Sequence, residues 1–372
     1  MAKVLHLRCS GSLLGAEAVI LELASSPTDH GYEPVVGVIH DRRDPFPELA
    51  TTAEKQNINH RVFQASRRID LACIINIRRY IKSENIDIIH THGYREDLYA
   101  LLSHTGRPIC ATNHLWKRSN LTLMLYAYID SIAMSQIDHI VAVSQPILEE
   151  MEASPFIDNK KLSMISNGID TKKFHPNNTS TIRDELNINP DTILITAVSS
   201  LTSEKGHTYL LDALAQLKSK ISDFHLLIIG DGSEQTSIEQ QINSLDLSDQ
   251  VTLLGRRSDI NNIHAATDIY ALPSLKEGLP MSLLEAMASG VCSVATNVGD
   301  ISKCIDNNVT GVIVKPRDAD ALMCAIHTLC LDASIRDRIG RAAATLIQEK
   351  FSTETMAGKY NELYNQMLSV NN

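Results

Sequence analysis

Two glutamates, Glu277 and Glu285, lie in a segment whose pattern predicts a strand, a tight loop and a helix. The segment is Asp268–Gly290, which reads DIYALPSLKEGLPMSLLEAMASG. Asp268–Ser274 is a short apolar run, and Pro280–Ser289 carries apolar residues at helical spacing before a glycine that favours a helix end. Backbone N–H groups at a helix N-terminus attract phosphate, and a carboxylate beside them suits sugar hydroxyls. The segment therefore predicts a site for a phosphorylated sugar.

Other polar residues stand where further predicted strands end. Lys205, in SLTSEKGH, precedes a helix and can neutralise a leaving phosphate. His114 ends the strand Ile109–His114 and can donate a hydrogen bond to a ligand. The loop Gly11–Glu17 has small residues that fit either a backbone approach to a phosphate or a plain tight turn. Because it lacks the GxGxxG pattern, we do not expect a nicotinamide cofactor.

Two motifs suggest metal binding but favour other interpretations. His90 and His92 lie on one face of a predicted strand, because side chains alternate along it. The sequence shows no third ligand at metal-site spacing, so we expect no metal. Asp318 and Asp320 resemble a DxD motif. They open a predicted helix, where carboxylates complement the helix dipole, and we interpret them as structural.

The elements that position these residues follow an alternating order. Strands and helices alternate in the first half, polar breakers follow from about Thr171 to Asp191, and the alternation then restarts. This pattern predicts an α/β fold with two doubly wound domains, in which ligands bind at the carboxyl ends of the strands. We expect domains at 1–175 and 176–351, with a C-terminal helix in 352–372. The predicted strands are Lys3–Cys9, Pro34–Ile39, Asp87–His92, Ile109–His114, Ile140–Ser144, Leu162–Ser166, Thr192–Ser199, His225–Gly230, Val251–Leu254, Asp268–Ser274, Val291–Thr296 and Gly311–Val314.

Composition limits the class of protein. The chain has 372 residues, is 44% hydrophobic and contains seven cysteines without a CxxC pair. Scattered cysteines indicate reduced thiols, and the first residues lack the pattern of a signal peptide. The sequence has no run of eighteen apolar residues that would predict a spanning helix. We therefore expect a cytoplasmic globular protein.

Charge is unevenly distributed. The net charge is −10, yet residues 1–175 carry 19 basic and 20 acidic residues. Basic doublets such as Arg42–Arg43, Arg67–Arg68 and Arg78–Arg79 fall in this half. The acidic total argues against nucleic-acid binding, whereas a locally basic face suits either solvent or an anionic lipid surface.

Taken together, the motifs resemble glycosyltransferase family 4, a family of retaining enzymes with the GT-B fold. The combination covers nearly the whole chain, and the Glu-x7-Glu loop with its upstream motifs is specific. The matching motifs are Gly15–Glu17, IIHTHG at Ile88–Gly93, TNH ending at His114, VAVS at Val141–Ser144, SNGID at Ser166–Asp170, EKG at Glu204–Gly206, IIGDG at Ile228–Gly232, Glu277 with Glu285, and NVTGVIV at Asn308–Val314.

The resemblance implies a GT-B architecture, in which two Rossmann-like domains face each other across a cleft and the C-terminal helix crosses back to the first domain. It also implies a nucleotide diphosphate sugar as co-substrate and no metal. The catalytic residues it implies are His114, Glu277 and Lys205. The donor-binding residues it implies are Gly15, Ala16, Ser200, Lys205, Gly255, Arg256, Glu277, Gly278, Leu279, Pro280, Met281, Ser282 and Glu285, and the acceptor-binding residues are Glu17 and His92.

Two departures from the family pattern stand out. Ser199–Ser200 occupies a place where relatives often have Gly-Arg, so Lys205 must neutralise more of the diphosphate charge, with Arg256 or Arg257 as a candidate replacement cation. The loop Gly299–Lys303 lacks the paired glycines and the glutamate of many relatives. This departure leaves open the donor preference that the resemblance implies, but not the fold.

We expect a retaining hexosyltransferase that moves a hexose or N-acetylhexosamine to a glycan or lipid-linked acceptor, in cell-envelope or exopolysaccharide synthesis. The enzyme would act in the cytoplasm, on the inner face of the plasma membrane. Two alternatives remain open. One is a non-hydrolysing UDP-GlcNAc 2-epimerase, which shares the architecture. The other is a catalytically weak nucleotide-sugar-binding partner subunit.

Overall fold

The computed structural model describes residues 1–9, 15–25, 31–67, 69–103, 105–113 and 131–370. The chain divides into two compact units. Unit 1 is Met1–Gly168 together with Thr353–Asn372, and unit 2 is Ile169–Ser352. The C-terminal helix thus belongs to the same unit as the N-terminal strands. Among the described residues, no helix combines the length and hydropathy that a membrane crossing requires.

Unit 1 is built on a seven-stranded sheet in the order β3-β2-β1-β4-β5-β6-β7. All of its strand pairs are parallel. The strands are β1 (Ala2–Arg8), β2 (Tyr32–Asp41), β3 (His60–Ala65), β4 (Ile88–Thr91), β5 (Ile109–Asn113), β6 (His139–Ala142) and β7 (Leu162–Met164). The helices are α1 (Gly15–Ser25), α2 (Glu48–Lys55), α3 (Leu71–Ser83), α4 (Tyr94–Ser103), α6 (Gln145–Glu152), α15 (Thr353–Val370) and the short 3₁₀ helix η1 (Asn159–Lys161).

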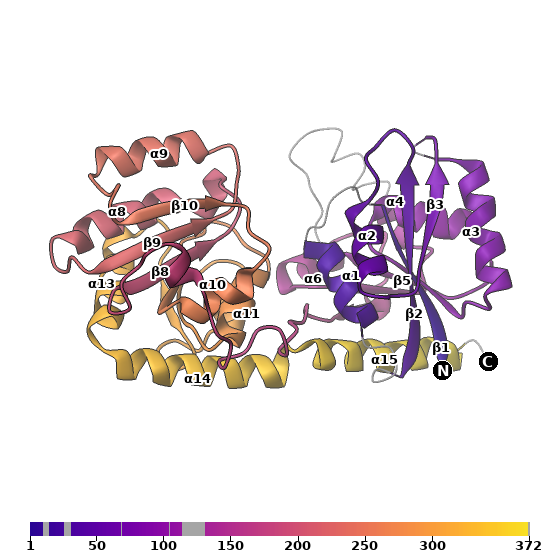
Figure 1. The fold of residues 1–372 in the computed structure, drawn as a ribbon. Helices are drawn as coiled ribbons and strands as arrows, with labels where there is room; N and C mark the ends of the chain where they lie inside the picture. The colour runs from indigo at the N-terminus through magenta and orange to yellow at the C-terminus, as the bar shows by residue number, and fades with distance from the viewer. Residues whose placement is uncertain (10–14, 26–30, 68, 104, 114–130, 371–372) are drawn as a thin grey trace. The chain divides into compact units, whose positions relative to one another are not determined.

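Helices cover both faces of this sheet (Figure 1). Buried side chains of α3, α4 and α6 pack with Leu5 and Leu7 of β1 on one face. On the other face, α1 and α2 pack against Val36 and Val38 of β2. Apolar strands covered on both sides are the pattern that the alternating sequence predicted.

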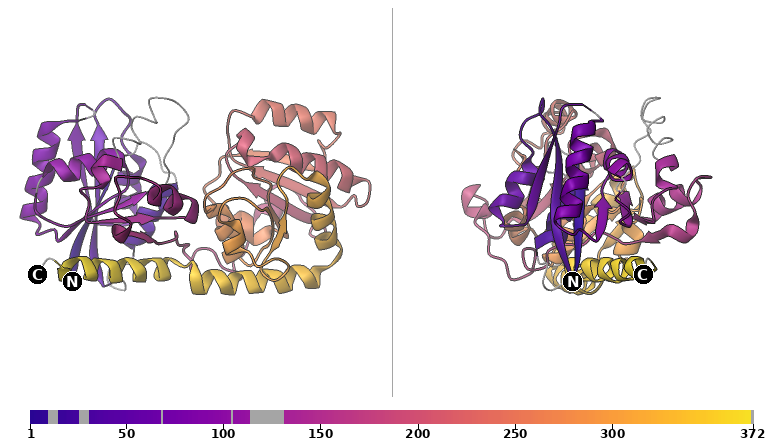
Figure 2. Two further views of the ribbon diagram at one scale, coloured as in Figure 1. Left: turned by 180° about the vertical axis from the view of Figure 1, so that it is seen from behind. Right: turned by 90° about the vertical axis from the view of Figure 1, so that its right-hand side faces the viewer.

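Unit 2 repeats the plan with a six-stranded sheet in the order β10-β9-β8-β11-β12-β13, again with parallel pairs. Figure 2 shows it from two further sides. The strands are β8 (Ile193–Val198), β9 (Phe224–Ile229), β10 (Val251–Gly255), β11 (Ile269–Leu272), β12 (Cys292–Thr296) and β13 (Val312–Val314). The helices are α7 (Ile182–Glu185), η2 (Ser203–Lys205), α8 (His207–Lys218), α9 (Gln235–Ser244), α10 (Ile260–Ala266), α11 (Met281–Ala288), α12 (Ile301–Cys304), α13 (Ala319–Leu331) and α14 (Ala333–Lys350).

The predicted fold class is confirmed, since both units are doubly wound and the order of strands reverses direction once in each. The reversal falls between β1 and β4 in unit 1 and between β8 and β11 in unit 2. In open sheets of this type, ligands bind outside the carboxyl ends of the strands at such a switch point. The switch point of unit 2 lies beside the segment that contains Glu277.

Strand β3 and helix α2 are among the elements of unit 1 that the sequence did not predict. Strand β3 (His60–Ala65) forms the edge of its sheet, and Arg61 and Gln64 are exposed on it. Helix α2 (Glu48–Lys55) is short and buries only Leu49, Ala50 and Ala53. Each element gives only a short apolar signal, because β3 buries only Phe63 and Ala65 and α2 is eight residues long.

Candidate active site

Glu277 is placed by the strand–loop–helix segment that the sequence predicted. The four residues of β11 are fully buried, and α11 buries Leu283, Leu284 and Met287 on its inner face. Pro280 precedes the helix and Gly290 follows it with φ of +74°, the conformation in which glycine ends helices. The loop between strand and helix thus has fixed ends, and Glu277 lies in its middle.

Two side chains hold the Glu277 carboxylate. Lys205 Nζ donates to Oε1 at 2.7 Å, and Ser274 Oγ donates to the same oxygen at 2.6 Å. The Glu277 side chain is only 7% exposed and that of Lys205 18%. Within the described part of the chain, both hydrogen bonds use Oε1. The second oxygen, Oε2, therefore remains as an acceptor for a hydroxyl group of a ligand.

Backbone contacts position Lys205. The turn η2 (Ser203–Lys205) lies against the loop after β11, where Leu275 N donates to Glu204 O at 2.7 Å. Gly206 follows with φ of +68°, and a Cβ there would lie 2.2 Å from Pro273 O. Only glycine permits this approach. Two loops from neighbouring strands, β8 and β11, are thereby held together, and the Lys205–Glu277 pair results.

A buried tyrosine orients a hydroxyl in the first turn of α11. Tyr270 OH donates to Ser282 Oγ at 2.8 Å. Burial raises the pKa of Tyr270, so its hydroxyl stays protonated and keeps this donor role. The first N–H groups of a helix have no carbonyl partner within it, so a helix start carries partial positive charge. The Ser282 hydroxyl adds a polar atom to that helix start.

The other predicted donor-binding residues of this segment differ in how far they are exposed. Gly278 is exposed, and its carbonyl accepts a hydrogen bond from Asp300 N at 3.1 Å. Leu279 and Met281 are half-buried, Pro280 is buried, and Glu285 is half-buried on α11. The loop Gly299–Lys303, which departs from the family pattern, therefore contacts the Glu277 loop directly.

The predicted cations differ in what surrounds them. Arg257 binds Glu185 at 2.6 Å and Asp259 at 2.8 Å, so two carboxylates already neutralise it. Arg256 is exposed, as is Ser200. Gly255 ends β10 with φ of +63° and has open space where a Cβ would project. Arg256 thus remains the candidate for a second cation, whereas Arg257 has a structural role.

Close backbone contacts require the glycines of the Gly230–Gly232 turn. A Cβ on Gly230 would lie 1.9 Å from Ser199 O, and one on Gly232 would lie 2.3 Å from Leu201 O. Asp318 also has its predicted structural role, because its carboxylate accepts from Ala321 N and caps α13. Asp320 accepts from Gln216.

In unit 1, the predicted residues of the first loop lie at the start of α1. Gly15 is exposed with open space around it, and Ala16 is half-buried. Glu17 is 1% exposed, and its carboxylate accepts a hydrogen bond from Arg8 Nε at 2.7 Å. The assignment of Glu17 to binding of the acceptor substrate stays a prediction. His114 lies outside the described residues.

A second buried carboxylate joins Glu17 at the switch point of unit 1. Glu96, in the first turn of α4, accepts from Cys9 N at 2.5 Å and lies 3.7 Å from Arg8 Nη1. Burial raises the pKa of Glu96, and the Arg8 charge opposes that rise. Arg8 thus bridges the starts of α1 and α4. Sequence reasoning missed this cluster, because Arg8 and Glu96 are far apart in the chain.

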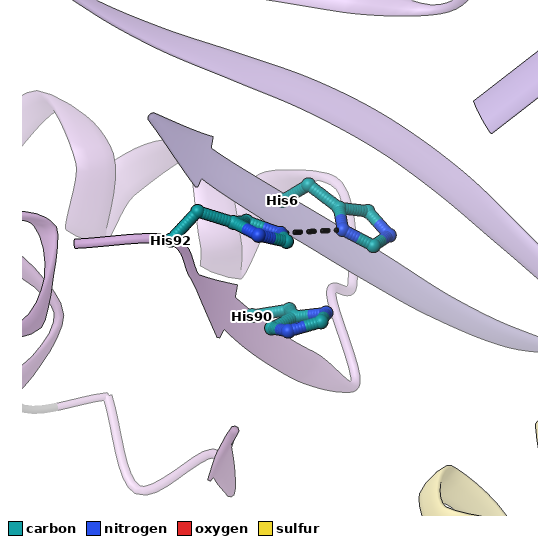
Figure 3. Close-up of side chains that lie close together, drawn as sticks. All are labelled: His6, His90 and His92. Carbon is teal, nitrogen blue, oxygen red and sulfur yellow. Dashed lines mark hydrogen bonds between the residues drawn. The ribbon is translucent and has the colours of Figure 1, made fainter. Parts of the chain in front are cut away.

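Three buried histidine side chains lie close together on the unit 1 sheet (Figure 3). His6 of β1 faces His90 and His92, and the potential ligand atoms of the three rings lie within 4.8 Å of one another. His6 Nδ1 and His92 Nε2 share a hydrogen bond of 3.1 Å. The third imidazole comes from a neighbouring strand, in register with His90, which spacing along the sequence could not reveal.

Hydroxyl groups complete this cluster. His90 binds Tyr364 OH through Nδ1 and Thr112 Oγ1 through Nε2, both at 2.7 Å. Tyr360 OH also bonds Thr112 Oγ1, at 3.0 Å. Tyr360 and Tyr364 belong to α15, so the network attaches the C-terminal helix to strands β4 and β5. Both ring nitrogens of His90 are thus used in packing α15 onto the sheet.

Acidification should destabilise unit 1 through His6. Burial lowers the pKa of His6 to about 3, against an ordinary value near 6.5. Below pH 6.5 the unfolded chain binds a proton at His6 that the folded chain does not. The contribution of His6 to the free energy of unfolding is therefore fully present above pH 6.5 and falls as the pH drops toward 3. The loss is about 1 kcal/mol between pH 6.5 and 5.5. Equilibrium denaturation at the two pH values measures this, and the variant His6→Gln should show a smaller loss. An equal loss in the variant would contradict the assignment.

Comparison with known proteins agrees with this architecture. Residues 14–173 match the model of Glycosyltransferase Family 4, and residues 178–346 match that of Glycosyl transferases group 1. The chain is 25% identical over 312 residues, 80% of each chain, to a UDP-Gal:alpha-D-GlcNAc-diphosphoundecaprenol alpha-1,3-galactosyltransferase of Escherichia coli.

Solved structures are similar over nearly the whole chain. A glycosyltransferase from Rickettsia africae has a TM-score of 0.83 at 25% identity, covering 99% of this chain and 98% of that one. Anabaena HepE, solved with UDP and glucose, has a TM-score of 0.83 at 23% identity, with 98% and 100% covered. The fold and the two family matches define a GT-B glycosyltransferase. The chain belongs to glycosyltransferase family 4.

Proposed function

We propose that this glycosyltransferase retains anomeric configuration and moves a hexose or N-acetylhexosamine from a nucleotide diphosphate sugar to a glycan or lipid-linked acceptor, in cell-envelope or exopolysaccharide synthesis. The observation that carries the proposal is the Glu277 carboxylate, which Lys205 and Ser274 hold next to the start of α11. An oriented carboxylate, a cation and a helix N-terminus are the groups that a sugar diphosphate requires.

Each group has a role in this proposal. Glu277 Oε2 accepts hydrogen bonds from hydroxyl groups of the donor sugar, and Glu285 binds the ribose. The diphosphate lies at the start of α11, where Lys205 neutralises the charge that develops on the leaving phosphate. From the family resemblance alone, we assign His114 to recognition of the transferred sugar and the acceptor, and Gly15 to recognition of the diphosphate.

The proposed chemistry needs no enzymatic nucleophile. The acceptor hydroxyl attacks the anomeric carbon on the face from which the phosphate departs, and the leaving phosphate oxygen takes the hydroxyl proton. The protein contributes by orienting the sugar and stabilising the phosphate charge. From the family resemblance we propose that no metal takes part in transfer, and the use of Asp318 as a helix cap agrees with this.

The names of two relatives support a choice of donor and acceptor class. HepE was solved with UDP and glucose, and the Escherichia coli relative is named for UDP-Gal and a diphosphoundecaprenol acceptor. We therefore place UDP-sugars first among candidate donors and lipid-linked saccharides first among acceptors. An enzyme acting on such acceptors would work in the cytoplasm, at the inner face of the plasma membrane.

A thermal-shift series tests donor binding. We expect one UDP- or GDP-sugar to raise the melting temperature, because a ligand at about 100 times its Kd stabilises the folded state by about 2.7 kcal/mol. The same nucleoside without its diphosphate should give a much smaller shift, since the proposed site holds phosphate and sugar. A folded protein that responds to no nucleotide sugar would contradict the proposal.

Product analysis separates the two alternatives. Release of nucleotide only in the presence of a lipid-linked acceptor supports transfer. Epimer formed without any acceptor would indicate the 2-epimerase. Donor binding without turnover, with every acceptor tried, would favour the partner subunit, for which the Ser200 substitution is the motivating feature.

A further inference from the structure

We propose that the outer face of α3 binds an anionic lipid surface. This outer face consists of Leu71, Ile75, Arg78, Arg79 and Lys82, all of which are exposed. The inference deepens the proposed function and rests on it for the acceptor, because the surface would hold the enzyme beside a lipid-linked saccharide.

Helical spacing brings these side chains together. They follow one another at i, i+4, i+7, i+8 and i+11, which fall on one side of a helix with 3.6 residues per turn. The opposite side of α3 packs into the core of unit 1 through Cys73, Ile74, Ile77 and Ile81. The outer face therefore cannot turn inward, and it is presented to whatever lies beyond unit 1.

The face combines apolar and basic side chains. Leu71 is 74% exposed and Ile75 48%, and Ile69 immediately before the helix is 53% exposed. The residues from Leu71 to Ser83 include three cations and no Asp or Glu. Apolar side chains that can enter the headgroup region, flanked by Arg and Lys, characterise helices that lie on anionic membranes.

The cations of this face are available to phosphate headgroups. Among the described residues, no ion pair involves Arg78, Arg79 or Lys82. The carboxylates that flank α3 in sequence have other partners. Asp70 caps α3 and accepts from Ser66, and Glu84 accepts a hydrogen bond from Lys3 at 3.1 Å. The positive charge along the outer face is thus not compensated locally.

A lipid surface fits this face better than a protein does. Three of the five residues of this face are cations and α3 contains no carboxylate, so the partner must be anionic along the length of the helix, as a surface of anionic headgroups is. Lipid phosphates accept hydrogen bonds from Arg and Lys without a fixed geometry, so a stripe on one helix suffices. The lipid-linked acceptor named for the Escherichia coli relative supports the same partner.

Vesicle sedimentation tests the inference. The full-length protein should sediment with vesicles of phosphatidylcholine and phosphatidylglycerol, but not with phosphatidylcholine alone, and high salt should release it. The variant Arg78→Ser with Arg79→Ser should bind about 25-fold more weakly, at about fivefold per cation. Leu71→Ser with Ile75→Ser should also weaken binding.

A matched control removes the same charge elsewhere. Lys220 and Lys315 are exposed in unit 2, and Lys220→Ser with Lys315→Ser should bind vesicles like the wild-type protein. Melting temperature and UDP binding verify that each variant is folded and that the donor site is intact. A folded wild-type protein that binds neither UDP-sugars nor GDP-sugars would instead contradict the proposed function, independently of the vesicles.

Three outcomes would overturn the inference. The first is a wild-type protein that does not bind anionic vesicles. The second is equal weakening by the unit 2 control, which would indicate a general charge effect. The third is a wild-type oligomer that dissociates when Leu71→Ser and Ile75→Ser are introduced, although vesicle binding persists. That result would assign the face to contact with a second copy of the chain.

Discussion

Replacing Glu277 by Ala should lower kcat/KM for sugar transfer by about 100- to 1,000-fold. Hydrogen bonds between a charged group and a substrate contribute about 1.5–3 kcal/mol each, and Glu277 Oε2 is positioned to accept from sugar hydroxyls. The change also removes the partner that fixes Lys205 Nζ at 2.7 Å. Initial rates with a nucleotide sugar and its acceptor measure the effect.

The free nucleotide separates this role from a structural one. Glu277 is assigned to the sugar and Lys205 to the phosphate. The Kd of UDP for Glu277→Ala should therefore lie within a few-fold of the wild-type value. The UDP-sugar should lose the affinity that it has beyond that of UDP. Glu204→Ala, a change at an exposed glutamate beside Lys205, is the matched control and should leave transfer unchanged. Equal loss of UDP and UDP-sugar affinity would argue against sugar recognition by Glu277.

Local patterns predicted the part of the site that is continuous in sequence. The apolar run of β11, the helical spacing of α11 and the terminating Gly290 lie close together, so periodicity located Glu277 in a loop before the structure was known. The same reasoning located Lys205 before α8. Elements with strong periodicity and clear ends are those that sequence alone resolves.

Contacts between distant residues could not be predicted in this way. Ser274 was assigned to the end of a strand, and nothing in its spacing indicated that its hydroxyl binds Glu277. His6 lies 86 positions from His92, and their contact follows from parallel pairing of β1 with β4. Pairing of non-neighbouring strands depends on the whole sheet, so such contacts appear only once the topology is known.

The ion pairs of Arg8 and Arg257 were likewise not predictable from sequence spacing. The sequence shows a cation or a carboxylate at a loop, but it does not show whether another side chain already neutralises it. Arg257 was a candidate replacement for the missing arginine, and its bonds to Glu185 and Asp259 account for its charge. The availability of a charged group is a property of its three-dimensional neighbours.

Replacing Gly299 by Ala should destabilise unit 2 by about 3 kcal/mol and also reduce transfer. Gly299 has φ of +57°, and a Cβ there would lie 2.2 Å from Glu277 O. The left-handed conformation alone costs a residue with a Cβ about 1–2 kcal/mol, and relief of the clash requires the Glu277 backbone to move. Equilibrium denaturation measures the loss of stability.

Gly106→Ala is the matched control, because Gly106 has φ of +71° with open space around the position of a Cβ. It should cost only about 1–2 kcal/mol and leave transfer unchanged. Activity of the double variant then tests the link to Glu277. If Gly299→Ala acts by displacing that carboxylate, adding it to Glu277→Ala should lower kcat/KM little further, because the two changes remove one interaction. Additive losses would show that Gly299 affects transfer by another route.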